Sequence, residues 1–258
     1  MKNHFYLGFV VVFLLLSCRS YVISNQQSQN NSVEKIESAN SELLEIIIPY
    51  NDSLEKTMSG VIGYSEEELF TGSPEGKLGN FVADLCLSIL DKKYTNDASD
   101  TADFVLLNNG GFRTFMPAGA ITTGKIYEIM PFENELVVVT LSIEKTVELF
   151  QYIAEKTAKE GNRKQGVPIS GNVRVELMDK TPVEVLVNGA RLRSRPYKVI
   201  TTDYLANGGD NMSFFLNPLK YQKLNLKLRD AILQEVIELD KSGLKVSAKL
   251  DNRVKYVD

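Results

Sequence analysis

Two apolar runs in this sequence each end in a pair of glycines flanked by polar side chains. The first, 104–113, reads FVLLNNGGFR and ends in Arg113, and the second, 197–210, ends in Asn-Gly-Gly-Asp210. A glycine pair lets the backbone adopt positive φ and lets another group approach closely. A buried strand that breaks into such a turn is where α/β proteins often bind a polar or anionic ligand, although a plain tight turn is an equally simple explanation.

Aromatic and polar side chains near both turns have the chemistry to hold a nucleoside. Phe132 follows the first turn and Tyr204 lies within the second, and stacking on such rings is worth about 1–3 kcal/mol per base. The polar candidates are Asn108, Arg113, Asn134 and Asp210. The carboxylate could accept hydrogen bonds from vicinal hydroxyls, the guanidinium could pair with a phosphate or ribose oxygen, and the amides could bind polar ring edges. The alternative is that both rings are core aromatics.

Composition excludes several classes of function. The chain has 258 residues, a net charge of −4 and a pI of about 5.3, so no basic surface favours nucleic acid. Its single histidine, His4, lies in a segment that we expect to be removed. Without imidazole, Ser-His-Asp and Cys-His systems and His-containing metal sites are excluded. Only carboxylate, lysine or tyrosine chemistry then remains. Because no set of metal ligands is visible in the sequence, we predict no catalytic residue, no metal ligand and no cofactor in this chain.

The N-terminus has the features of a secretory signal. Residues 1–18 combine a charged start, a short apolar run and the pair Ser17-Cys18. This ending resembles the bacterial lipobox, which implies a lipid on Cys18, although a plain signal peptide with an incidental cysteine is the alternative. Residues 19–40 are polar and predict a flexible tether. We expect a lipid-anchored protein of the bacterial cell envelope, facing the periplasm or the surface.

The remaining residues, 41–258, predict one domain of the α/β (α+β) class, with a mixed β-sheet core and flanking helices. We expect a connector helix over 41–58 with a break or kink near Pro49, and Cys86 as a small buried hydrophobe. The expected strands are 59–65, 104–107, 135–141, 173–177, 183–191 as a hairpin, 197–202 and a closing strand 244–250. The expected helices are 81–90, 121–130, 143–159 after a capping Ser142, and 226–239.

Several motifs together resemble the C-terminal domain of the 5′-nucleotidases. They are Leu78–Asp84, Leu107–Arg113, Pro117–Thr122, Met130–Val139 and Tyr197–Asp210, in that order. The resemblance runs from about Ile46 to the end. It implies that Phe132 and Tyr204, the latter where a Phe is usual, sandwich the base. It also implies that Asp210 binds ribose hydroxyls, that Asn108 and Arg113 contact the base, ribose or phosphate, that Asn134 contacts the base edge, and that Gly171 lines the pocket through its backbone.

The sequence departs from that family in two ways. The metallophosphatase domain that holds two metal ions in the family has no counterpart, because the signal and tether occupy its place. Ser73 stands where an Arg is usual, and Lys77 is a partial substitute at best. We therefore expect a nucleoside- or nucleotide-binding domain that does not hydrolyse alone. The alternatives are the binding subunit of an enzyme completed by a separate metallophosphatase chain, which would hold the divalent metals, and an envelope interaction protein with a degenerate pocket.

Overall fold

The computed structural model describes residues 41–93, 101–159 and 165–257. The residues from Ile48 onward form one compact unit. The predicted signal peptide 1–18, with Cys18, and the tether 19–40 lie outside the described residues. The description below concerns the compact unit.

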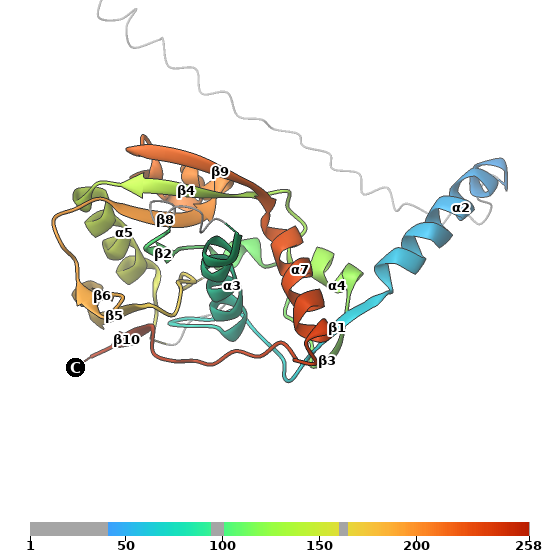
Figure 1. Ribbon diagram of the computed structural model, residues 1–258, viewed down its shortest axis with the longest axis horizontal. Coiled ribbons are helices and arrows are strands. Elements are labelled where there is room, and N and C mark those ends of the chain that lie inside the picture. Colours follow the sequence, from blue (N-terminus) through green and yellow to red (C-terminus); the bar gives the residue numbers. More distant parts are fainter. Residues whose placement is uncertain (1–40, 94–100, 160–164, 258) are drawn as a thin grey trace, which may run out of the picture. The chain divides into compact units, whose positions relative to one another are not determined.

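A four-stranded mixed sheet is the centre of the unit (Figure 1). Its strands are β2 (Phe104–Val105), β8 (Tyr197–Thr202), β4 (Glu135–Leu141) and β9 (Lys220–Lys227), in the order β2-β8-β4-β9. Strand β2 runs parallel to β8, whereas β4 is antiparallel to both β8 and β9. Mixed strand directions with helices on the sheet confirm the α+β class.

Strand β4 shows why the sheet separates two hydrophobic cores. Leu136 and Val138 belong to one buried cluster, while Val137 and Val139 belong to the other. Successive side chains of a strand point to opposite faces of its sheet. The continuous apolar run Leu-Val-Val-Val therefore marks a strand that is buried on both sides.

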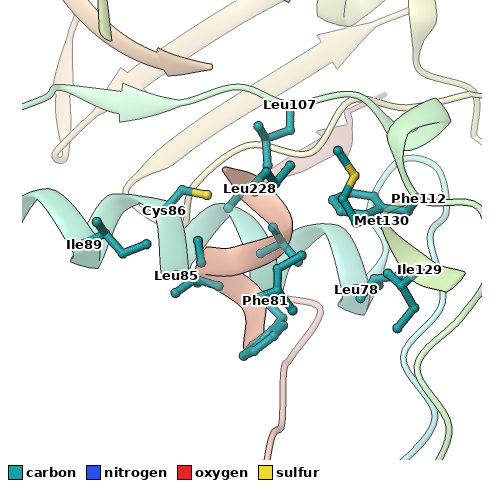
Figure 2. Packing of buried hydrophobic residues seen from close by; sticks show 14 of the residues in the cluster. Leu78, Phe81, Leu85, Cys86, Ile89, Leu107, Phe112, Ile129, Met130 and Leu228 are labelled. Atoms are coloured by element: carbon teal, nitrogen blue, oxygen red, sulfur yellow. The ribbon is translucent and has the colours of Figure 1, made fainter. Parts of the chain in front are cut away.

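The first core is built on α3 (Lys77–Lys93), with α4 (Thr123–Ile129) and α7 (Leu228–Lys241) beside it. Figure 2 shows one face of α3, with Leu78, Phe81, Leu85, Cys86 and Ile89 directed into this core. These positions follow the three-to-four residue spacing of an amphipathic helix. Burial raises the pKa of the Cys86 thiol, so Cys86 is a small buried hydrophobe, as predicted.

The second core lies between the central sheet and a second four-stranded sheet, with α5 (Ile143–Lys156) packed between them (Figure 1). The second sheet has the order β10-β5-β6-β7 and consists of β10 (Val254–Tyr256), β5 (Val173–Met178), β6 (Thr181–Val187) and β7 (Ala190–Arg191). The β6–β7 hairpin turns at Asn188 and Gly189, both with positive φ, which confirms the predicted Asn-Gly turn. A two-stranded sheet joins β1 (Val61–Ser65) to β3 (Gly119–Thr122).

The remaining elements are one long helix, α2 (Ser41–Met58), and four short ones. The short ones are α6 (Asp203–Ala206) and the 3-10 turns η2 (Asn109–Gly111), η3 (Gly209–Asn211) and η4 (Ser213–Phe215). Helix α2 continues through Pro49, which lies inside the helix. Of the two outcomes expected there, the break is therefore wrong, and the kink stays a prediction. None of the described helices is both long and apolar enough to span a membrane.

Two element predictions need larger corrections. The helix expected over 121–130 begins only at Thr123, because Ile121 and Thr122 pair with β1 and the Thr122 hydroxyl caps the helix by accepting from the Lys125 N–H at 3.1 Å. The closing strand expected over 244–250 is wrong. Only Val246 forms a bridge there, to Ser65 at the end of β1, and the last strand is β10.

Two further elements also differ from expectation. Helix α5 ends at Lys156, three residues before Lys159, where we expected it to end, and its C-cap residue Thr157 has an extended backbone.

The sequence does not predict strand β9, because its residues KYQKLNLK are mostly polar. An edge strand with one solvent-facing side and several lysines has this composition.

Candidate functional site

Three segments meet at one edge of the central sheet. Because β2 and β8 are parallel, their carboxyl ends lie at the same edge, and the antiparallel β4 begins there, with Leu136 opposite Thr202. The segment after β2 carries Asn108 and Arg113, the segment before β4 carries Phe132 and Asn134, and α6 with its following turn comes directly after β8. Ligands of α/β proteins commonly bind beyond the carboxyl ends of such strands.

A cavity of about 330 Å³ lies where these segments meet. Its lining residues are Asn108, Gly110, Gly111, Arg113, Phe132, Asn134, Tyr204 and Asp210. Six of the seven binding residues that the sequence predicts are thus brought together around one space, although the first and last of them are 102 positions apart in the chain.

Both aromatic rings of the cavity are available to a ligand. Phe132 is 41% exposed and Tyr204 is 46% exposed, so neither is a core aromatic. The Arg113 guanidinium carbon lies 5.9 Å from the centre of the Phe132 ring. The Tyr204 ring lies on the backbone of Gly209, where an added Cβ would come within 2.5 Å of it, so the glycine is required for the ring to take this position.

Asp210 is held in place by four hydrogen bonds. Its carboxylate accepts from the Asn108 amide at 2.6 Å and from the Tyr204 hydroxyl at 2.9 Å, and its backbone carbonyl accepts from the Tyr152 hydroxyl at 2.8 Å. Its backbone N–H donates to the Tyr204 hydroxyl oxygen at 3.3 Å. The residue has a φ of 53°, and Gly208, two residues before it, has a φ of 86°. The bond to Asp210 raises the pKa of Tyr204, so its hydroxyl remains a donor. A carboxylate has further lone pairs, and these can accept from ligand hydroxyls.

The turn that carries Phe132 is fixed from its other side by charged residues. The carboxylate of Glu133 accepts hydrogen bonds from Lys227 and Arg229 at the junction of β9 and α7. Arg229 also donates to the Pro131 carbonyl at 3.3 Å, and the Leu228 N–H donates to the Asn134 carbonyl at 2.9 Å. The backbone on both sides of Phe132 is therefore bound to one junction, which leaves the ring to face the cavity.

Glu133→Gln is expected to destabilise the protein at neutral pH and to lose that effect in acid. Hydrogen bonds from Lys227 and then Arg229 lower the pKa of Glu133 from 4.5 to about 2. A carboxyl group whose folded pKa is lowered contributes stability above its unfolded pKa and loses it as the pH falls through its folded pKa. The gap in free energy of unfolding between wild type and variant, measured by urea denaturation, should shrink as the pH falls from neutrality toward the folded pKa. An equal gap at both ends of this range would count against this charge pair, and Glu184→Gln, which removes a carboxylate paired with Arg191, is the control.

Gly171, Ser73 and Lys77 do not line this cavity. The Gly171 N–H donates to the Asp84 carboxylate at 2.7 Å, so the backbone that the resemblance places at the pocket instead binds helix α3. The Ser73 hydroxyl donates to the Ala158 carbonyl at 3.0 Å and accepts from the Ala158 N–H at 2.9 Å. Lys77 pairs with Glu67 and so does not substitute for an arginine at the cavity.

The sequence does not indicate the supporting residues Glu133, Tyr152 and Arg229. Each contacts a residue that is distant in the chain, and Tyr152 appears in the sequence only as one position of an amphipathic helix. In the part of the chain that the structure describes, no group of three or more His, Cys, Asp or Glu side chains is arranged to hold a metal ion.

The fold and the site define an α+β domain with a polar, aromatic-walled pocket at one edge of its central sheet. The family model described as "5'-nucleotidase, C-terminal domain" matches residues 61–217, and the chain belongs to this family.

Known relatives agree with this assignment. The chain is 25% identical over 228 residues to the trifunctional nucleotide phosphoesterase protein YfkN of Bacillus subtilis, covering 81% of this chain and 14% of that protein. It is 32% identical over 109 residues to a 5′-nucleotidase of Vibrio parahaemolyticus, covering 42% of this chain and 19% of that protein. The crystal structure of a 5′-nucleotidase precursor from Thermus thermophilus shares the fold, with a TM-score of 0.65 and 23% identity over 83% of this chain and 43% of that one. The chain thus spans less than half the length of each of these proteins.

Proposed function

We propose that this chain binds nucleosides or nucleotides and takes part in nucleotide catabolism. The observation that carries the proposal is that two half-exposed rings, Phe132 and Tyr204, line one cavity together with Asp210. An aromatic pair suits the flat face of a base, and a fixed carboxylate suits a ribose diol. Membership of the 5′-nucleotidase C-terminal domain family supports the same ligand class.

In the proposed complex, the base lies between the two rings and the Asn134 amide binds its polar edge. The ribose hydroxyls donate to Asp210, whose position is set by Asn108 and Tyr204. Arg113 supplies positive charge to the cavity and suits a phosphate or ribose oxygen. Every one of these roles is binding, and none moves a proton or forms a bond.

Hydrolysis of a phosphate ester requires charge stabilisation of the kind that metal ions supply. We propose that a metallophosphatase works together with this domain, as a separate chain that holds the divalent metals. What supports this second proposal is a property of the relatives: the matched region makes up only 43% of the Thermus nucleotidase and 19% of the Vibrio one, so most of each of those proteins lies outside this domain. An interaction protein with a degenerate pocket is the competing outcome, and the half-exposed rings argue against it.

Thermal unfolding of the full chain tests the ligand class. Adenosine and adenosine 5′-monophosphate should both raise the melting temperature in a concentration-dependent manner, because a ligand that binds only the folded state stabilises it. Ribose 5-phosphate, which lacks a base, should raise it far less. Equal shifts with ribose 5-phosphate would contradict base stacking, and no shift with any of the three would favour the degenerate pocket.

We also propose that Cys18 anchors the protein in the bacterial envelope, on the sequence of residues 1–18. Cys18→Ala should move the protein from the membrane fraction to the soluble fraction after cell lysis, because one or more acyl chains supply the membrane affinity. Wild-type protein should also incorporate labelled fatty acid, and the variant should not. A variant that stays in the membrane fraction and still carries label would overturn the anchor.

A further inference from the structure

The turn that carries Asp210 has an uncommon backbone conformation. Asp210 and Asn211 have φ angles of 53° and 63°, and they follow Gly208, which has a φ of 86°. Two consecutive residues with side chains in the left-handed region carry an energetic cost, although Asp and Asn tolerate this region better than most residues. Such a conformation persists only where surrounding contacts hold it, and it is frequent where a side chain is aimed at a ligand. The contacts that hold this turn therefore bear on what Asp210 can bind.

Two tyrosine hydroxyls hold the backbone of Asp210, one at each of its polar groups. The Tyr204 oxygen accepts from the Asp210 N–H at 3.3 Å, and the Tyr152 hydroxyl donates to the Asp210 carbonyl at 2.8 Å. Tyr204 lines the nucleoside cavity, whereas Tyr152 does not. Tyr152 therefore acts on this cavity through Asp210 and not through contact with a nucleoside.

Tyr152 is a rigid support for the Asp210 carbonyl. It lies on α5, and its ring packs edge-on against Phe214, with ring centres 5.4 Å apart and Phe214 only 4% exposed. Lys156, one turn further along α5, places its ammonium 5.4 Å from the centre of the same tyrosine ring. Burial raises the pKa of Tyr152 to about 12, so its hydroxyl stays protonated and donates at neutral pH. The helix and the second core thus fix where the Asp210 carbonyl lies.

We propose that Tyr152 is a positioning residue that makes the pocket selective for ribonucleosides over nucleosides whose sugar lacks the vicinal hydroxyls. The inference rests on the proposed function. The Asp210 carboxylate accepts from Asn108 at one oxygen and from Tyr204 at the other, so each oxygen keeps a lone pair for a ribose hydroxyl. Hydrogen bonds weaken steeply when their geometry departs from the optimum, so the diol is bound well only while Tyr152 holds the turn. Stacking of the base on the two rings does not depend on this hydrogen bond.

Calorimetric titration of the full chain in detergent tests the inference with adenosine and 2′,3′-dideoxyadenosine, which keeps the base and lacks both hydroxyls. The wild type should bind adenosine about tenfold or more tightly than the dideoxynucleoside, because hydrogen bonds to a charged carboxylate are strong. Tyr152→Phe should lower the affinity for adenosine about threefold to tenfold, the effect of one net hydrogen bond. It should leave the affinity for 2′,3′-dideoxyadenosine unchanged.

Tyr256→Phe is the matched control for Tyr152→Phe. The Tyr256 hydroxyl also donates to a backbone carbonyl, that of Thr157 at 3.0 Å, directly after the end of α5. A lysine, Lys159, also stands over its ring, at 5.2 Å, but Tyr256 does not contact Asp210 or line the cavity. Both variants remove one such hydrogen bond and should still unfold cooperatively, but only Tyr152→Phe should reduce the preference for adenosine.

The outcomes separate the positioning role from the proposed function. An equal loss of affinity for both nucleosides in Tyr152→Phe, no loss for either, or the same loss of preference in Tyr256→Phe would overturn the positioning role. Equal binding of the two nucleosides by the wild type would also overturn it, because Asp210 would then not bind the diol, and base stacking would still stand. If neither nucleoside bound, the proposed function would fail, and this inference with it.

Discussion

Tyr204→Ala is expected to weaken adenosine binding by roughly tenfold to a hundredfold, because stacking of one base on one ring contributes about 1–3 kcal/mol. The ring is half exposed and lies on Gly209 beside the cavity, so its removal should cost little packing. Phe132→Ala should have an effect of similar size from the opposite wall. Calorimetric titration with the full chain measures both.

Tyr204→Phe is the matched control for the stacking claim. It keeps the ring and removes only the hydroxyl that donates to Asp210 at 2.9 Å. We expect it to retain most of the affinity that Tyr204→Ala loses. If the two variants lost affinity equally, the hydroxyl would be the important group, and the stacking account would be wrong.

Arg253→Met is expected to lower the free energy of unfolding by about 1–3 kcal/mol, because it removes a buried, hydrogen-bonded guanidinium whose partners Asp84 and Asp251 have side chains that are 48% and 35% exposed. Arg253 is only 3% exposed. Its guanidinium donates to Asp84 at 2.5 and 2.8 Å, to Asp251 at 2.9 Å and to the Ile169 carbonyl at 2.8 Å. The variant removes the donor from all of these acceptors and releases the C-terminal segment from α3.

Arg191→Met is the control for that loss of stability. Arg191 also pairs with a carboxylate, that of Glu184 at 2.7 Å, but its side chain is 82% exposed. Water already solvates the Arg191 guanidinium in the folded protein, so we expect its removal to change the free energy of unfolding by less than about 1 kcal/mol. Urea denaturation measures both variants, and equal losses would show that burial of Arg253 does not set the size of the effect.

Much of the fold can be predicted from the sequence, because in many segments the local residue pattern favours the same element that the packing of the folded chain requires. The run Leu136–Val139 predicts a buried strand, and the structure confirms it with a core on each face. The hairpin at Asn188-Gly189 is equally local, since both residues adopt positive φ. The segment 244–250 looks like a strand for the same reasons, but only Val246 finds a partner there, in Ser65. Strand formation depends on that partner, which the local sequence does not contain.

The candidate site also has a part that the sequence predicts and a part that it does not. Its lining residues follow recognisable turns, and the resemblance to the 5′-nucleotidases points to six of the lining side chains from the sequence alone. The residues that hold them cannot be found this way, because the pairs Glu133–Arg229 and Tyr152–Asp210 each join distant parts of the chain. The match around Gly171 is loose, and its N–H binds Asp84 rather than lining the pocket.

Calorimetric titration of adenosine into the full chain tests the central claim most directly, with Phe132→Ala measured under the same conditions. We predict saturable heat with one site per chain for the wild type, and its loss in the variant at the same concentrations. No heat from the wild type at millimolar adenosine, in protein that still unfolds cooperatively, would contradict the nucleoside pocket.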